Sequence, residues 1–144
     1  MGGINLARVL IGGLLAGVIY NISGFGAGQV VDLAHTFARF GWEPSTGSTI
    51  QHAAVRFGFG LISVFTYAAI RPRFGPGLKT AIIAACILWI AAAAPLVFVL
   101  TELFVFSGSQ AVILLVWTLV EACVATSVGG WLYQELESRG AGVG

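Results

Sequence analysis

The sequence predicts an all-α fold, an up-down-up-down bundle of four transmembrane helices that forms a single membrane domain over residues 1–144. The first observation is composition: 58% of the residues are hydrophobic and 9% are charged, whereas soluble domains carry about 25% charged residues. The second is the spacing of the charges, which leaves long apolar gaps, and about 20 apolar residues let a helix cross a ~30 Å hydrocarbon core. The expected helices cover about residues 6–29, 49–70, 78–101 and 109–134.

The same composition argues against several classes of function. The seven basic residues form no stripe that follows a phosphate backbone, so no nucleic-acid partner is expected. Cys86 and Cys123 lie inside apolar runs, so we interpret them as small core residues rather than as disulfide or metal ligands. No serine, cysteine or threonine stands in a recognisable pattern with a base and an orienting partner, so we expect neither an enzyme nor a cofactor.

The first helix follows from the 23 uncharged residues between Arg8 and Asp32. This run is longer than the roughly 7 to 15 residues of a signal-peptide core, and other apolar runs follow it, so we expect a retained helix. One face carries residues that let a neighbouring helix approach closely, namely Gly13, Gly17, Asn21, Gly24 and Gly28. The glycine-rich run at 24–28 is interpreted as helix packing, because no strand precedes it as in a nucleotide-binding loop.

A short helix lying in the membrane interface is expected at about 30–40, ending at Gly41. Its apolar residues recur at helical spacing, at Val30, Leu33, Ala34 and Phe37. The capping-box pattern then recurs where the second and fourth long helices should begin, at Ser48 with Gln51 and at Ser107 with Gln110.

Proline limits the second helix and bends the third. The run 71–77 contains two prolines, and a proline biases the residue before it away from helix, so the second helix should end near Ile70. This tight turn makes the second and third helices antiparallel neighbours. In the third helix, Pro95 deprives the carbonyl of Ala91 of its partner, which predicts a kink.

Arg56 and Glu121 are the most informative residues, because a charge in the hydrocarbon core costs a few kcal/mol and rarely lacks a partner. At 1.5 Å per residue, Arg56 lies about 10 Å and Glu121 about 18 Å below the outer surface. The long side chain of Arg56 spans the difference of about 8 Å between these two depths. We predict an intramembrane polar site in which Asn21 assists this pair, and in which His52 and Thr118 extend polar stripes. A register-fixing ion pair is favoured over an ion path, because one carboxylate and one arginine form no relay chain.

Two other interpretations of the polar residues stay open. In the first, Glu121 has no arginine partner and hydrogen-bonds Trp89 on the third helix. In the second, His35 and His52 ligate a haem. A bis-histidine site inside the bundle is not favoured, because His52 lies at a helix mouth and His35 in the outer loop.

The basic residues predict the orientation, because cytoplasmic flanks carry the excess of lysine and arginine. One side would hold Arg8, Arg71, Arg73, Lys79 and Arg139, and the other Arg39 alone. Both termini and the turn at 71–79 are thus expected in the cytoplasm. The lipid bilayer is the first expected partner, with head-group contacts worth about 1 kcal/mol each at Arg71, Arg73 and Lys79. An aromatic belt near the same level would comprise Tyr67, Trp131 and Tyr133.

Several stretches of the sequence carry a family resemblance. They are Arg8-Val-Leu-Ile-Gly-Gly-Leu-Leu-Ala-Gly-Val18 followed by Asn21, Tyr67-Ala-Ala-Ile-Arg71-Pro-Arg73-Phe-Gly-Pro-Gly77-Leu-Lys79, and Trp117-Thr-Leu-Val-Glu121 through Trp131-Leu-Tyr133-Gln-Glu135. Together they resemble an uncharacterised family of small bacterial membrane proteins with no assigned activity. The resemblance implies four helices and a bacterial inner membrane. Family members often carry an acidic residue shortly after the Asn21 position, where this chain has Ser23 and Gly24, which weakens the idea of a shared polar site on the first helix.

The expected function is that of a small membrane-embedded accessory or structural protein, acting by helix–helix association with itself or with another membrane protein. The alternative is a small oligomeric transporter or channel whose path is lined by Arg56 and Glu121. A third class is a haem or quinone redox subunit.

Overall fold

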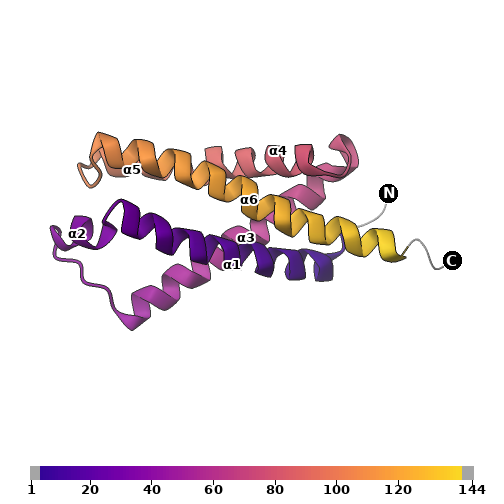
Figure 1. The fold of residues 1–144 in the computed structure, drawn as a ribbon, viewed down its shortest axis with the longest axis horizontal. Coiled ribbons are helices and arrows are strands. Elements are labelled where there is room, and N and C mark those ends of the chain that lie inside the picture. Colours follow the sequence, from indigo (N-terminus) through magenta and orange to yellow (C-terminus); the bar gives the residue numbers. More distant parts are fainter. Residues whose placement is uncertain (1–3, 141–144) are drawn as a thin grey trace.

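All regular structure in the part of the chain that is described is helical (Figure 1). A computed structural model describes residues 4–140, and for 134–140 it describes the backbone alone. The elements are α1 (Leu6–Val30), α2 (Leu33–Ala38), α3 (Thr46–Phe74), α4 (Leu78–Leu88), the π-helical segment η1 (Trp89–Ala93), α5 (Ala94–Glu102) and α6 (Gly108–Gly140). Four stretches are long and apolar enough to cross a membrane, namely Leu6–Val30, Thr46–Phe74, Leu78–Glu102 and Gly108–Tyr133. The prediction of an all-helical chain with four such helices is confirmed.

Glycines let α1 pack closely against α3 and α6. A Cβ added at Gly12 would lie 2.6 Å from the carbonyl oxygen of Gly129 on α6. A Cβ added at Gly13 would lie 2.7 Å from the Cα of Leu61 on α3. Real Cβ atoms do not approach other atoms so closely, so glycine at these positions is what allows the backbones to meet.

The predicted glycine face of the first helix is therefore used inside the chain. Its contacts with α3 run in opposite chain order, because Gly13 meets Leu61 whereas the later Gly17 meets the earlier Phe57. Gly28, at the far end of the same face, has only an ordinary neighbour at 3.8 Å. The close approach of helix backbones to α1 is thus at Gly12, Gly13 and Gly17.

The second long helix passes Ile70 and continues to Phe74, so the predicted end of this helix was wrong. Pro72 lies inside the last turn, where a proline removes one backbone hydrogen bond rather than breaking a long ladder. Gly75 then turns the chain with a φ of 82°, and its N–H donates to the carbonyl of Arg71 at 2.8 Å. This bond caps the helix beyond the proline.

Tyr67 and Tyr133 are core residues, so the prediction that they belong to an interfacial belt was wrong. Their rings meet edge to face with centroids 6.3 Å apart. The hydroxyl of Tyr67 accepts a hydrogen bond from the N–H of Gly77 at 3.2 Å, and the guanidinium of Arg71 stacks 5.6 Å from the centroid of the Tyr133 ring. A tyrosine can be buried at such a turn because its polar tip finds a partner there. Trp131 alone of the predicted belt is exposed.

The third long helix contains a wider turn just before Pro95. In η1 the N–H of Ala94 donates to the carbonyl of Trp89, five residues earlier. Pro95 then stands in the first turn of α5, where its missing N–H costs least. The chain therefore accommodates the proline through a π turn, a feature that the sequence had not indicated.

The connections between α1 and α3 and between α5 and α6 follow the predicted elements with one shift. The predicted short helix is α2, and its N-cap Asp32 accepts a hydrogen bond from the N–H of His35 at 3.3 Å. The capping box at Ser107 and Gln110 is confirmed. The other box was placed three residues too late, because Ser45 and Ser48 form it. The N-cap residue of α3 is thus Ser45, which lies just outside the apolar run.

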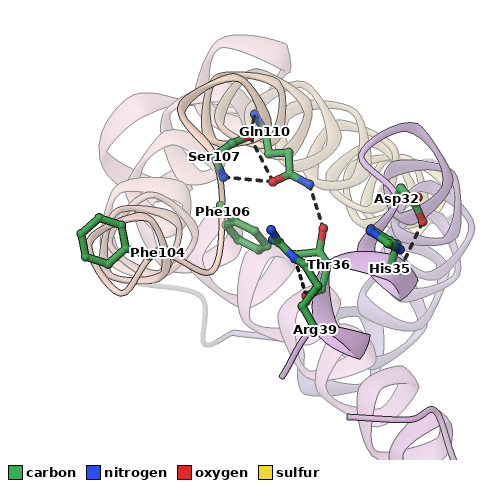
Figure 2. A pocket seen from close by; sticks show the side chains of 8 residues that line it. All are labelled: Asp32, His35, Thr36, Arg39, Phe104, Phe106, Ser107 and Gln110. Carbon is green, nitrogen blue, oxygen red and sulfur yellow. Dashed lines mark hydrogen bonds between the residues drawn. The ribbon is translucent and has the colours of Figure 1, made fainter. Parts of the chain in front are cut away.

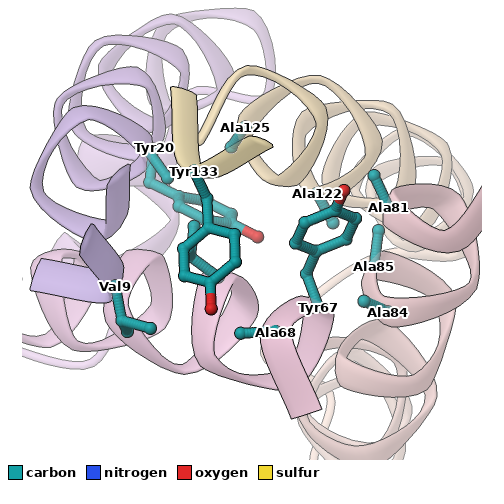
Figure 3. Close-up of a cluster of buried hydrophobic side chains, with 12 residues drawn as sticks. Val9, Tyr20, Tyr67, Ala68, Ala81, Ala84, Ala85, Ala122, Ala125 and Tyr133 are labelled. Carbon is teal, nitrogen blue, oxygen red and sulfur yellow. The ribbon is translucent and has the colours of Figure 1, made fainter. Parts of the chain in front are cut away.

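Two hydrophobic clusters fill the space between the helices. The larger one is built from tyrosines, alanines and valines of α1, α3, α4 and α6 (Figure 3). Small alanines let these helices approach, and the tyrosine rings fill the volume that remains. The smaller cluster joins the end of α1 to α5 and to the start of α6, through Ala27, Val31, Val97, Phe106, Ala111 and Leu114.

Candidate functional site

Arg56 on α3 and Glu121 on α6 form an ion pair in the middle of the helices. Arg56 Nη1 donates to Glu121 Oε1 at 2.9 Å and to the carbonyl of Tyr20 on α1 at 2.6 Å. Arg56 Nε donates to His52 Nε2 at 2.9 Å. The Glu121 side chain is 4% exposed and that of Arg56 19%. A single guanidinium therefore ties three helices together, and its charge is balanced by a nearly buried carboxylate.

Gly24 makes room for this guanidinium. A Cβ added at Gly24 would collide with the guanidinium carbon and both terminal nitrogens of Arg56. This glycine is therefore needed for the position of the ion pair, in addition to the packing role that its spacing predicted. The alternative in which Glu121 lacks an arginine partner and bonds Trp89 was wrong.

Two residues of the predicted polar site make their hydrogen bonds elsewhere. Asn21 Nδ2 donates to the carbonyl of Gly17 at 2.8 Å and to that of Ala53 at 3.5 Å, so it ties α1 to α3. Thr118 accepts from Trp89 Nε1 at 3.0 Å and donates to the carbonyl of Leu114 at 2.7 Å. The predicted assistance of Asn21 to the pair was wrong, because an amide on a helix reaches a backbone carbonyl one turn away more readily.

Four polar residues near the pair, Ser23, Trp117, Tyr20 and Thr126, were not predicted as members of the site from the sequence. Trp117 Nε1 donates to Ser23 Oγ at 2.9 Å, which joins α6 to α1. Tyr20 Oη and Thr126 Oγ1 are buried close to each other, with the Ser63 hydroxyl also near Tyr20, but no well-aligned hydrogen bond joins them. Tyr20, which follows Gly13 by seven residues and therefore shares its inward face, was recognisable from that spacing.

The predicted lipid contacts gather at the turn between α3 and α4. Arg73 and Lys79 are exposed there, whereas Arg71 is half-buried over the ring of Tyr133. The side chain of Arg139, predicted on the same side, lies outside the described part of the chain.

Two cavities lie at opposite ends of the helices. The larger, of about 520 Å³, is bordered by α2 and the connection between α5 and α6 (Figure 2). Its lining includes His35, one of the two histidines of the haem interpretation. The smaller, of about 130 Å³, lies beside Tyr67 and Gly77. Neither cavity is lined by Arg56 or Glu121, so the ion pair is a contact between helices rather than the wall of a described cavity.

Comparison of the chain with protein-family models, with curated proteins and with solved structures found no match. The class is therefore defined by the fold and the polar residues alone. It is an all-helical protein with four candidate membrane-spanning helices and an ion pair between two of them.

Proposed function

We propose that this chain is a multi-pass integral membrane protein of a bacterial inner membrane, an up-down-up-down bundle with both termini in the cytoplasm. The four long apolar helices support membrane insertion. The exposed Arg73 and Lys79 at the α3–α4 turn support its cytoplasmic position and its contact with lipid head groups. The bacterial location rests on the family resemblance.

Within that membrane we propose an accessory or structural role that depends on association with another membrane-embedded chain. The observation that carries it is the first third of α3. No residue between Thr46 and Val55 is buried, although these residues belong to a candidate membrane-spanning helix. In Figure 1 this part of α3 diverges from the other helices. Polar side chains within it, such as Gln51, are better accommodated against protein than against lipid.

The ion pair fits the same role. Arg56 is held at once by Glu121, His52 and the carbonyl of Tyr20, so its hydrogen-bonding groups serve to fix three helices. Breaking one partner of a buried pair is destabilising, which suits a register lock. A firm bundle would then present the start of α3 to its partner in a fixed direction.

Photo-crosslinking in intact membranes tests the association. A photoreactive residue at Ile50, which is 65% exposed at the start of α3, should yield a crosslinked product. The matched control is Ile90, which is 63% exposed on η1 and should yield none. A native mass spectrum of gently extracted protein then tells whether the partner is a second copy or a different chain. A monomeric mass without product at Ile50 would contradict the proposal.

The alternative is a small transporter or channel, and the buried hydroxyls of Tyr20 and Thr126, which lie close to each other and to Glu121, favour it. Buried hydroxyls without a well-aligned partner are positions where internal water binds, and water beside Glu121 would permit proton passage. Proteoliposomes with an entrapped pH-sensitive dye test this alternative. Glu121→Gln should abolish proton flux without unfolding the protein, whereas equal dye responses of protein-free vesicles and both proteins would exclude it.

A further inference from the structure

The larger cavity is an open groove with the volume of a small-molecule site and a partly polar lining. It is bordered by α2, by the turn after α5 and by the beginning of α6, and its volume is about 520 Å³. Small-molecule sites have volumes of about 300–1,000 Å³. Figure 2 shows side chains from both chain segments lining it, with Asp32 and His35 on one side and Ser107 and Gln110 across from Thr36.

The cavity is held open by hydrogen bonds between distant parts of the chain. Gln110 Nε2 donates to the carbonyl of Val31 and to Thr36 Oγ1, both at 2.8 Å. Arg39 Nη2 donates to the carbonyl of Val105 at 3.2 Å. These bonds join α2 to the connection between α5 and α6 from two sides. The site is therefore formed before any ligand binds, which lowers the cost of binding.

Its lining carries one charge of each sign. The carboxylate of Asp32 and the guanidinium of Arg39 both border the cavity, and both residues are exposed. A guanidinium has five N–H donors, and Arg39 uses Nε and Nη2 for the carbonyls of Thr36 and Val105. The remaining donors suit a phosphate, and the free Asp32 oxygen suits an ammonium.

Part of the rim of the cavity is apolar. Phe104 lines it, is 87% exposed and has a φ of 56°. That left-handed conformation ends α5, because the N–H of Phe104 donates to the carbonyl of Thr101 and the N–H of Val105 to that of Leu100, as in a Schellman motif. Phe40 and Trp42, on the loop after α2, are exposed as well. Such aromatic residues occupy the level of lipid head groups in membrane proteins.

We infer that this cavity binds the head group of a phospholipid in which a phosphodiester is followed by a primary ammonium, as in phosphatidylethanolamine. Arg39 binds the phosphodiester, Asp32 binds the ammonium, and Phe104 packs against the acyl chains. An anionic head group without an amine leaves Asp32 unpaired, and a quaternary ammonium has no N–H to donate to it. This inference rests on the membrane location proposed above.

Native mass spectrometry of the detergent-extracted full chain, with phosphatidylethanolamine, phosphatidylcholine or phosphatidylglycerol added in turn, tests the site. The wild type should retain phosphatidylethanolamine about tenfold better than the other two, since one charge-assisted hydrogen bond distinguishes them. Asp32→Asn removes the charge while asparagine still caps α2 and tolerates the φ of 49°. It should abolish the preference, whereas Arg39→Gln should weaken binding of all three lipids.

The control variants are Glu43→Gln, in the same outer connection but outside the lining, and Lys79→Gln at the opposite end; both should keep the preference. Equal retention of the three lipids by the wild type, or an unchanged preference in Asp32→Asn, would overturn the inference. Full displacement of the lipid by soluble glycerophosphoethanolamine would also overturn it, because the occupant of the site would then be a soluble phosphodiester with an ammonium group rather than a lipid. A protein that fails to sediment with membranes refutes the proposed location, whereas one that sediments but shows no preference refutes this site alone.

Discussion

Replacing Gly12 by alanine should force α1 and α6 apart. The new Cβ would lie 2.6 Å from the carbonyl oxygen of Gly129 and 3.3 Å from Val64 Cγ1. The first neighbour is backbone and cannot rotate away, so the two helices must separate by roughly 0.6–0.8 Å to restore an ordinary contact of about 3.3 Å. Such overpacking costs about 1–3 kcal/mol of the free energy of unfolding.

The matched control is Gly28→Ala in the same helix, where the nearest atom would lie 3.8 Å from the new Cβ. Both variants gain the same helix propensity, at most about 1 kcal/mol, so their difference isolates the clash. Gly12→Ala should therefore unfold with a free energy about 1–3 kcal/mol lower than Gly28→Ala. Titration with dodecyl sulfate in mixed micelles, followed by tryptophan fluorescence, measures both.

A double-mutant cycle tests whether Gly12 and Gly129 form one shared contact between α1 and α6. The double variant of Gly12→Ala and Gly129→Ala should lose less free energy than the sum of the two single variants, because the first separation already makes room for the second methyl. Equal free energies of unfolding for Gly12→Ala and Gly28→Ala would refute the reasoning, since they would mean that the helices do not meet at this glycine.

Further outcomes follow from the polar contacts. Arg56→Gln and Glu121→Gln should each lower the free energy of unfolding by about 3–5 kcal/mol, and the double variant by less than the sum, as measured in the same titration. Gln110→Ala should cost about 1–3 kcal/mol and speed amide hydrogen exchange in α2, because it removes both bonds to that helix. Trp117→Phe loses the bond to α1 and should cost about 1 kcal/mol, whereas Trp131→Phe, at an exposed position, should change stability by less than about 0.5 kcal/mol.

The sequence predicted the position of a polar residue along its helix better than the direction in which its side chain points around the helix axis. The Arg56–Glu121 pair follows from the cost of an isolated charge between apolar helices, because each residue supplies the opposite charge that the other needs. His52 joins it because it stands one turn before Arg56 on the same face. Thr118 stands three residues before Glu121 on a similar face, but its hydroxyl accepts from Trp89 on η1 instead of joining the pair.

The end of α3 and the buried hydroxyls of Tyr20 and Thr126 could not be predicted from the sequence, for a different reason. The end of α3 depended on whether Pro72 fell in an interior or a final turn, and only the cap at Gly75 decided that. The meeting of the Tyr20, Ser63 and Thr126 hydroxyls depends on distances between side chains of different helices. No periodicity within one helix carries that information.

The π turn at Trp89–Ala93 lets the third long helix contain Pro95. A π turn is equivalent to one residue inserted into an α-helix, and it places Pro95 at the start of a new α-helical segment. A proline within an uninterrupted α-helix costs about 3 kcal/mol. We therefore expect any related chain whose third long helix is one residue shorter to carry another residue in place of Pro95.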